Sequence, residues 1–315
     1  MEQYCILGRI GEGAHGNFFK AKHVETGEIV ALKKVAIEPS LGADGMPLPP
    51  PPQVVQLKAV FPHSAGFVLA FEYMLSDLAE VLRHAQRPLA QVQVKSYLQM
   101  LLKGIAFCHA KNNCDLKPAN LLISASRQLK IADFGLAWGL FPRWLWYRAP
   151  ELLYGARQYN QGIDLCAVGW ILGELLNGSP LFPGENDIKQ LWASPDGPAS
   201  SPGDDYNKIS FKEQVPVPLE EVLLDASPQA LVFLGRFLLY PPLQRIAASQ
   251  ALLHQYFFTA PLPAHPSELP IPHCPGGPTP KAHPGSPHVH DFHVDWPLEE
   301  SLLNPELIWP FILEG

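Results

Sequence analysis

The sequence Asp115-Leu116-Lys117-Pro118-Ala119-Asn120 is followed by Asp133-Phe134-Gly135 and then by Ala149-Pro150-Glu151. Each of these short segments arises by chance in many proteins, but chance rarely produces all three in this order. Phosphoryl transfer needs a bound nucleotide, metal ions that neutralise phosphate charge, and a carboxylate that orients the attacking hydroxyl. Aspartate, lysine and asparagine are residue types that can meet such needs, and the kind of site that this ordered set forms depends on the segments around it.

A glycine-rich stretch lies upstream of these segments, between two strand-like runs. The stretch contains Gly11, Glu12, Gly13 and Gly16. Glycines let backbone amides approach phosphates without obstruction by side chains. A dinucleotide-binding loop would lead into a helix, whereas a strand-like run follows here. An ordinary hairpin turn explains the glycines equally well, so the stretch alone leaves both interpretations open.

The segment Val30-Ala31-Leu32-Lys33 places a lysine in an apolar strand, seventeen residues after Gly16. A buried ammonium group needs an anionic partner, such as a phosphate. The alternative is a surface lysine on an edge strand. The joint spacing of the glycine-rich stretch and the lysine favours phosphate binding.

Strand-like segments dominate the first part of the chain, and helical segments dominate the remainder. We expect strands over residues 4–10, 17–24, 29–35, 54–61 and 66–74. We expect helices over residues 88–111, 166–178, 227–240 and 247–258. Prolines at 47 and 49–52 exclude a helix interior from the stretch 36–53, because each proline lacks an N–H and fixes φ. The sequence therefore predicts an α+β fold.

The composition excludes several classes of protein. A net charge of -7 gives no broad reason to expect nucleic acid or an anionic membrane as a partner. The 5 cysteines lack CxxC spacing, which argues against a disulfide framework and a zinc site. No apolar run reaches the length of about 18 residues expected of a membrane span. We expect an intracellular protein of the cytoplasm or nucleus.

These motifs and their surroundings resemble the cyclin-dependent group of eukaryotic serine/threonine protein kinases. The segments that carry the resemblance are IGEGAHG, VALKKV, DLKPANLLIS, LKIADFGLA, WYRAPELLYG and GELLNGSPLFPG. The resemblance covers most of the chain and implies a two-lobed kinase fold. It places a β-rich N-lobe over residues 1–74, a larger α-helical C-lobe over 75–258, and a Pro/His-rich tail over 259–315.

The resemblance also implies catalytic roles for individual residues. Asp115 would accept the proton of the substrate hydroxyl, and Lys117 would approach the γ-phosphate. Lys33 would hold the α- and β-phosphates of ATP. Asn120 and Asp133 would bind Mg²⁺.

Further residues would contact the nucleotide itself. Ala31 and Leu122 would enclose the adenine, Phe71 would be the gatekeeper, and the backbone from Glu72 to Met74 would form the hinge. The full set of expected ATP contacts outside the catalytic residues is Ile10, Gly11, Glu12, Gly13, Gly16, Phe18, Ala31, Phe71, Glu72, Met74 and Leu122. The resemblance further implies an ion pair between Glu151 and Arg245.

The chain departs from the family pattern at three places. The proline-rich stretch 36–53 stands where the family has a regulatory helix that pairs with the lysine and docks a cyclin. We therefore expect no cyclin-type activator. Asn112-Asn113-Cys114 precedes Asp115, whereas the family has His-Arg before this aspartate. The thirteen residues between Gly135 and Ala149 contain no serine or threonine, which excludes the usual activation-loop phosphorylation.

Three interpretations follow from these departures. The first is a weak serine/threonine kinase that uses ATP and Mg²⁺, acts on protein substrates and is a monomer. The second is a pseudokinase or scaffold that binds nucleotide or protein partners without catalysis. The third is a chain that does not fold stably, because the missing helix would leave one face of the sheet uncovered.

Overall fold

The structure is a computed structural model that describes residues 3–13, 16–35, 52–63, 66–85, 88–109, 116–132, 142–156, 160–192 and 218–270. The chain divides into two compact units. The sheet unit comprises the described residues 3–13, 16–35, 57–63 and 66–73, and the helical unit comprises the other described residues. A β-sheet unit followed by a helical unit confirms the predicted α+β class.

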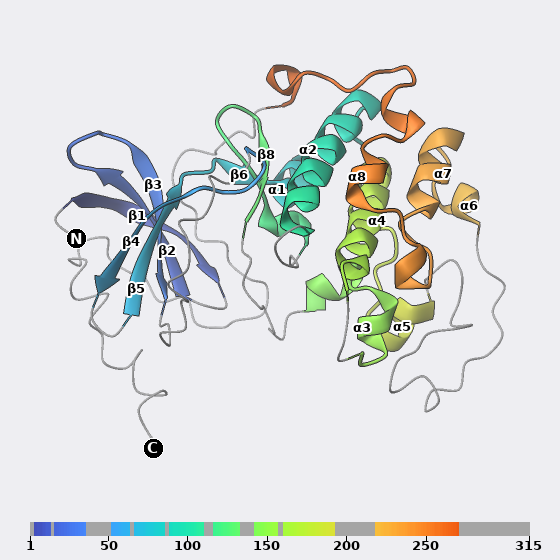
Figure 1. Cartoon of the computed structure of the whole chain (residues 1–315), viewed down its shortest axis with the longest axis horizontal. Coiled ribbons are helices and arrows are strands. Elements are labelled where there is room, and N and C mark those ends of the chain that lie inside the picture. The colour runs from blue at the N-terminus through green and yellow to red at the C-terminus, as the bar shows by residue number, and fades with distance from the viewer. Residues whose placement is uncertain are drawn as a thin grey trace. The chain divides into compact units, whose positions relative to one another are not determined.

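The sheet unit is a five-stranded antiparallel sheet in the order β1-β2-β3-β5-β4 (Figure 1). Its strands are β1 (Tyr4–Gly13), β2 (Gly16–His23), β3 (Ile29–Val35), β4 (Leu57–His63) and β5 (Gly66–Glu72). Successive side chains of a strand point to opposite faces. One face therefore collects a buried apolar cluster of Ala21, Val30, Leu32, Val68 and Ala70.

The predicted strand over 54–61 is wrong at its beginning, because β4 starts only at Leu57. Val54 instead forms a parallel bridge with Ile131 in the helical unit. The Val55 N–H donates to the Ile131 carbonyl at 3.0 Å, and the Ile131 N–H donates to the Gln53 carbonyl at 2.8 Å. The backbone groups of residues 53–55 are thus paired with another strand. The proline-rich residues 36–51, and with them the predicted loss of the regulatory helix, lie outside the described residues.

The helical unit combines eight labelled helices with a small three-stranded sheet in the order β6-β7-β8, within the described residues. The helices are α1 (Leu78–His84), α2 (Gln91–His109), α3 (Pro150–Leu153), α4 (Gly162–Asn177), α5 (Asp187–Trp192), α6 (Leu219–Val222), α7 (Pro228–Gly235) and α8 (Ala248–Ala251). The strands are β6 (Ser76–Asp77), β7 (Leu121–Ile123) and β8 (Leu129–Ile131). Three-residue 3-10 helices at Pro118–Asn120 and Gln255–Phe257 join these elements.

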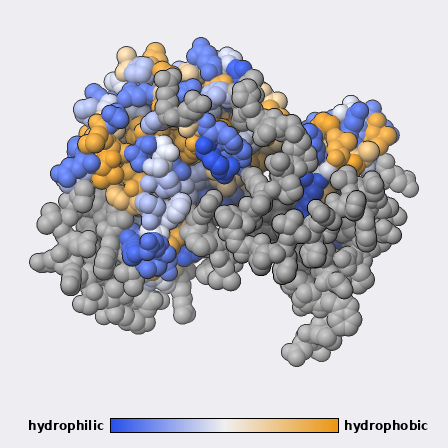
Figure 2. Space-filling model, turned by 180° about the vertical axis from the view of Figure 1, so that it is seen from behind, coloured by the Kyte–Doolittle hydropathy of each residue, from blue (hydrophilic) through white to orange (hydrophobic). Residues whose placement is uncertain are grey.

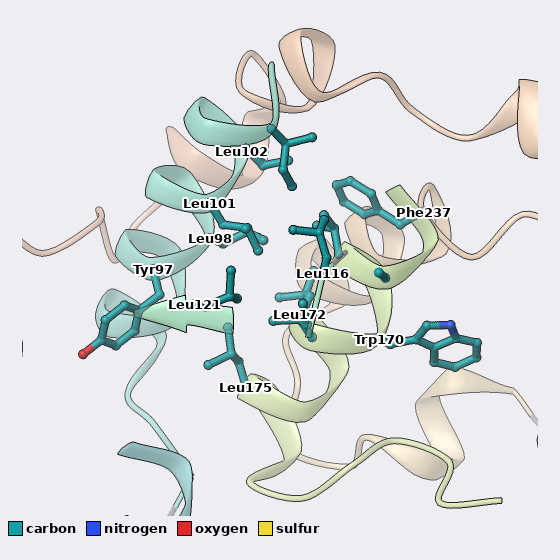
Figure 3. Packing of buried hydrophobic residues seen from close by; sticks show 14 of the residues in the cluster. Tyr97, Leu98, Leu101, Leu102, Leu116, Leu121, Trp170, Leu172, Leu175 and Phe237 are labelled. Atoms are coloured by element: carbon teal, nitrogen blue, oxygen red, sulfur yellow. The ribbon is translucent and has the colours of Figure 1, made fainter. Parts of the chain in front are cut away.

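The core of the helical unit lies between α2 and α4, which run side by side (Figure 1). Leu98 and Leu101 of α2 and Leu172 of α4 point into the same apolar interior (Figure 3). Gly169 lets α4 pack closely, because a Cβ there would lie 2.6 Å from a Leu238 methyl carbon. The long helix predicted over 88–111 is confirmed over α2, Gln91–His109, whereas residues 88–90 are not helical and residues 110–111 lie outside the described residues.

The helix predicted over 247–258 is wrong beyond its first turn. Helix α8 ends at Ala251, and His254 adopts an extended conformation with φ -68° and ψ 141°. The His254 imidazole Nδ1 accepts a hydrogen bond from the Tyr256 N–H at 3.2 Å, which starts a separate 3-10 turn. A side chain that bonds to nearby backbone in this way competes with helix continuation.

The surface visible in Figure 2 mixes hydrophilic and hydrophobic residues over the helical unit. The exposed large apolar side chains of this unit are Leu224, Val232, Leu243, Leu253, Phe258 and Leu262. Among the helices that the structure describes, none has the length and hydropathy needed to cross a membrane.

Candidate active site

The glycine-rich stretch forms the hairpin that joins β1 and β2. Gly13 pairs with Gly16, and Gly11 pairs with Phe18, so the glycines occupy ladder positions at the tip of the two strands. The expected contact residue Ile10 is 43% exposed on β1, and Glu12 pairs with Asn17. Residues 14 and 15 lie outside the described residues.

Lys33 is buried on β3, with only 8% of its surface exposed. Its neighbours Val30 and Leu32 point into the apolar cluster of the sheet, so Ala31 and Lys33 point to the opposite face. Lys33 lies directly opposite Phe18 of β2, and the Lys33 ammonium nitrogen is 5.0 Å from the centroid of the Phe18 ring. Lys33 is thus a buried cation on the strand that follows the glycine-rich hairpin. An anionic group such as a phosphate would stabilise a cation in this position.

Of the two expected nucleotide contacts on β5, Phe71 lies on the Lys33 face of the sheet and Glu72 lies on the opposite face. Phe71 is paired with Ala31, and Glu72 is paired with Val30. Directly paired residues share a face of the sheet, so Phe71 and Ala31 lie together. Met74 follows in the helical unit and is half-buried.

The remaining expected residues belong to the helical unit. Lys117 precedes the 3-10 helix Pro118–Asn120, and Leu122 lies on β7, paired with Lys130 of β8. The Asn120 carbonyl accepts a hydrogen bond from the Ala132 N–H at 2.9 Å. Because Ala132 directly precedes Asp133, this bond brings the chain leading to Asp133 against Asn120. Asp115 and Asp133 themselves lie outside the described residues.

The structure thus gathers the expected residues in two groups. The glycines, Phe18, Ala31, Lys33 and Phe71 share the sheet unit, and Lys117, Asn120 and Leu122 share the helical unit. Asn120 supplies an amide oxygen, a ligand type that suits Mg²⁺. No group of three or more His, Cys, Asp or Glu side chains able to hold a metal occurs within the described ranges.

A contact that the sequence analysis did not single out involves His109, the last residue of α2. His109 ends α2, and its Nε2 is 2.9 Å from an Asp164 carboxylate oxygen on α4. Both side chains are buried, with 8% and 2% exposed. Gln161 also donates from its amide nitrogen to the His109 carbonyl at 2.7 Å. These contacts hold the end of α2, from which the chain continues toward Asp115. The sequence around His109 did not indicate that Asp164 would be its partner.

The described end of the activation segment packs through its aromatic side chains. Leu145, Trp146 and Tyr147 are half-buried, and the Trp146 indole N–H donates to the Gly184 carbonyl at 3.0 Å. The Tyr147 hydroxyl donates to a carboxylate oxygen of Glu174, on α4, at 2.6 Å. Residues 133–141 lie outside the described ranges.

Glu174 gives the kinase-like helical unit a pH-dependent stability. Burial raises the pKa of Glu174 above its ordinary value of 4.5, and the hydrogen bond from Tyr147 opposes the rise. The folded state therefore holds this proton more tightly than the unfolded state, so the free energy of unfolding falls as pH rises from 4.5 through the folded pKa. We expect Glu174→Gln, which can still accept from Tyr147, to abolish this decline in thermal melts recorded as a pH series.

Tyr147→Phe provides the matched test of the same pair. It removes the hydrogen bond that lowers the pKa, so the decline should extend to higher pH than in the unmodified chain. Equal pH slopes for the unmodified chain and Glu174→Gln would contradict the assignment.

Arg245 links three segments of the helical unit through a buried ion pair. Its two Nη atoms donate to the two carboxylate oxygens of Glu151 at 2.7 and 2.8 Å, so the expected Glu151–Arg245 pair is confirmed. The guanidinium also donates to the carbonyls of Gly162, Leu239 and Tyr240. All five N–H donors of the side chain are thereby used.

Residues 259–264, at the beginning of the expected tail, pack on α2. The buried Lys95 ammonium donates to the carbonyls of Thr259 at 2.7 Å and Pro261 at 2.8 Å, and lies over the Tyr256 ring. Ser96 donates to the Ala264 carbonyl at 2.6 Å. The sequence analysis did not single out Lys95, although lysine is rarely buried without partners. Residues 271–315 lie outside the described residues.

Comparison with known proteins places this arrangement in a family. The family described as protein kinase domain matches residues 4–257. Cyclin-dependent kinase 20 of Mus musculus is 72% identical over an alignment of 348 positions that covers all of both chains. Cyclin-dependent kinase 20 of Danio rerio is 57% identical over 342 positions and 98% of each chain. Cyclin-dependent kinase D-1 of Oryza sativa subsp. indica is 38% identical over 93% of this chain and 74% of its own length.

The chain belongs to the cyclin-dependent kinase family of serine/threonine protein kinases. The resemblance inferred from the motifs is confirmed, including its specific form, cyclin-dependent kinase 20, also called cell-cycle-related kinase. The alignment with the mouse relative has 348 positions against 315 residues in this kinase, so the relative contains segments that this kinase lacks. An internally shortened cyclin-dependent kinase accounts for both the intact motifs and the departures from the pattern.

Proposed function

We propose that this kinase binds ATP with Mg²⁺ and transfers the γ-phosphoryl group to serine or threonine hydroxyls of proteins, with a preference for sites followed by proline. The observation that carries the proposal is the buried Lys33 on β3, in register with the β1–β2 glycine hairpin. Protein kinases as a family use ATP and Mg²⁺, and Mg²⁺ neutralises charge on the phosphates. Membership of the cyclin-dependent group supports a role in the cell cycle.

The chain's own residues supply binding and orientation. Lys33 would hold the α- and β-phosphates, and Asn120 and Asp133 would hold Mg²⁺. Asp115 would orient the substrate hydroxyl and take its proton, while Lys117 would stabilise charge on the phosphate. His109 supports this arrangement indirectly, because its contact with Asp164 fixes the helix end that leads to Asp115.

We further propose that transfer is slower than in the full-length relatives, and that no cyclin-type activator binds. The sequence has the proline-rich stretch 36–53 where the family has a glutamate-bearing helix, and Asn112-Asn113-Cys114 where the family has His-Arg before the aspartate. Misplacing a catalytic group by about 1 Å can cost about 100-fold in rate. We propose a monomer that acts inside the cell, in the cytoplasm or nucleus.

A thermal melt with and without MgATP tests nucleotide binding. At about 100 times its dissociation constant, the ligand should stabilise the folded state by about 2.7 kcal/mol, which raises the melting temperature by several degrees. Lys33→Met should abolish this shift. Lys34→Met is the matched control, because Lys34 is the next residue along β3 and points to the other face; it should preserve the shift.

The outcomes of this melt separate the three interpretations. A sharp transition that MgATP does not move would contradict the proposal and favour a scaffold that uses its surface. Absence of a cooperative transition would mean that the shortened chain does not fold stably.

A further inference from the structure

Phe18 occupies the position between the glycine hairpin and the lysine of the sheet unit. It is paired with Gly11 on one side and with Lys33 on the other, so the three residues form one row across β1, β2 and β3. Side chains of paired residues lie on the same face, with Cβ atoms about 5 Å apart. Glycine has no side chain, and Leu69 of β5 flanks Lys33 on its other side, so the Phe18 ring is the aromatic group beside Lys33 in this row.

The ring holds the Lys33 ammonium in a cation–π contact. The ammonium nitrogen is 5.0 Å from the ring centroid, within the range of about 6 Å over which the negative face of an aromatic ring attracts a cation. Lys33 is only 8% exposed, and such contacts strengthen when the cation is withdrawn from water. The contact therefore contributes to holding the ammonium beside the ring.

A phosphate that binds the Lys33 ammonium requires a different geometry from the ring. A charge-assisted hydrogen bond to a phosphate oxygen requires a nitrogen–oxygen distance of about 2.7–2.9 Å and a donor aimed at the oxygen. The ammonium has three N–H donors, and a donor directed at the ring face is not available to a phosphate. A phosphate therefore draws the ammonium away from the ring or bonds to fewer of its donors.

We propose that the Phe18 ring competes with the nucleotide phosphates for the Lys33 ammonium, so that Phe18 sets how tightly this kinase binds ATP. This inference rests on the proposed function, since it assigns Lys33 to the phosphates. Phe18 is thus a residue that controls affinity for the phosphate part of the ligand. Its effect passes through Lys33 and is independent of the adenine.

The test compares MgATP with adenosine, which lacks phosphates, by titration calorimetry of the full chain. In Phe18→Leu, which keeps an apolar side chain but removes the ring, the dissociation constant of MgATP should fall about 3- to 10-fold. The dissociation constant of adenosine should change less than about twofold. Phe18→Met repeats the test with a flexible apolar side chain, should leucine disturb folding.

Two controls tie the effect to the contact. Phe19→Leu makes the same change at the next residue, which packs against the apolar cluster on the opposite face of the sheet, and should leave the affinity for MgATP unchanged. In a Lys33→Met background, Phe18→Leu should no longer strengthen MgATP binding, because the two residues act as a pair.

Several results would overturn the inference. An unchanged or higher MgATP dissociation constant in both Phe18 variants would show that the ring does not compete. An equal gain for adenosine would show that the ring obstructs the base instead. If the folded chain and all variants bound neither ligand, the proposed function would fail and this inference with it. By contrast, if the chain binds MgATP and the Phe18 variants bind it equally well, only this inference fails and the proposed function stands.

Discussion

Arg245→Ala should lower the free energy of unfolding by about 3–5 kcal/mol, because it leaves the buried Glu151 carboxylate without its partner. The Glu151 side chain is 7% exposed, and each of its carboxylate oxygens accepts a hydrogen bond from Arg245. The substitution also removes donors from the carbonyls of Gly162, Leu239 and Tyr240. Since whole domains are stable by only about 5–15 kcal/mol, the loss should be plain in urea titrations.

Two further variants make this prediction specific. Arg236→Ala removes an exposed arginine near the same part of the chain, and should change stability by less than about 0.5 kcal/mol. The double variant Glu151→Gln with Arg245→Met removes both charges, and should be more stable than Arg245→Ala alone. A loss below about 1 kcal/mol in Arg245→Ala would mean that the pair does not hold these segments together.

Asp115→Asn should reduce the rate of phosphoryl transfer by about 10²- to 10⁴-fold, the usual contribution of a positioned acid or base. Asparagine has nearly the same shape but cannot take the proton of the substrate hydroxyl. Because Asp115 is not assigned to the nucleotide, the MgATP-induced rise in melting temperature should persist. The measurement is the initial rate of label transfer from γ-labelled ATP to a serine peptide, beside the melt.

Asp225→Asn supplies the matched control for this experiment. Asp225 is an exposed aspartate after α6, and its replacement should leave both the rate and the melt unchanged. Equal rates for the unmodified chain and Asp115→Asn would remove Asp115 from the chemistry.

Local sequence patterns predicted the sheet unit well. The β-rich composition of residues 29–35 predicted a strand there, and the structure has β3 over Ile29–Val35. The glycines before Asn17 predicted a chain reversal, which is the β1–β2 hairpin. These features depend on neighbours within the chain, so a single sequence contains their signal.

Features that depend on distant partners could not be predicted in this way. Val54 lies in an apolar run that continues into β4, so it was predicted to belong to that strand. Its neighbours Gln53 and Val55 instead form backbone hydrogen bonds with Ile131, more than seventy residues away. Lys95 can be buried because two carbonyls after α8 accept hydrogen bonds from its ammonium group. No sequence pattern within α2 indicates these two carbonyls. The cation–π contact of Phe18 with Lys33 needs the register of β2 against β3, which the hairpin alone does not fix.

The central claim is that this chain is a working serine/threonine kinase, and the most direct test is to identify its product. The full chain would be incubated with MgATP and a mixture of serine, threonine and tyrosine peptides, and the phosphorylated positions would be found by mass spectrometry. The account predicts phosphate on serine or threonine, mostly before proline, and none above background with Lys33→Met. A cooperatively folded chain that MgATP stabilises but that yields no more phosphopeptide than Lys33→Met would contradict it, and would identify a nucleotide-binding protein without transferase activity.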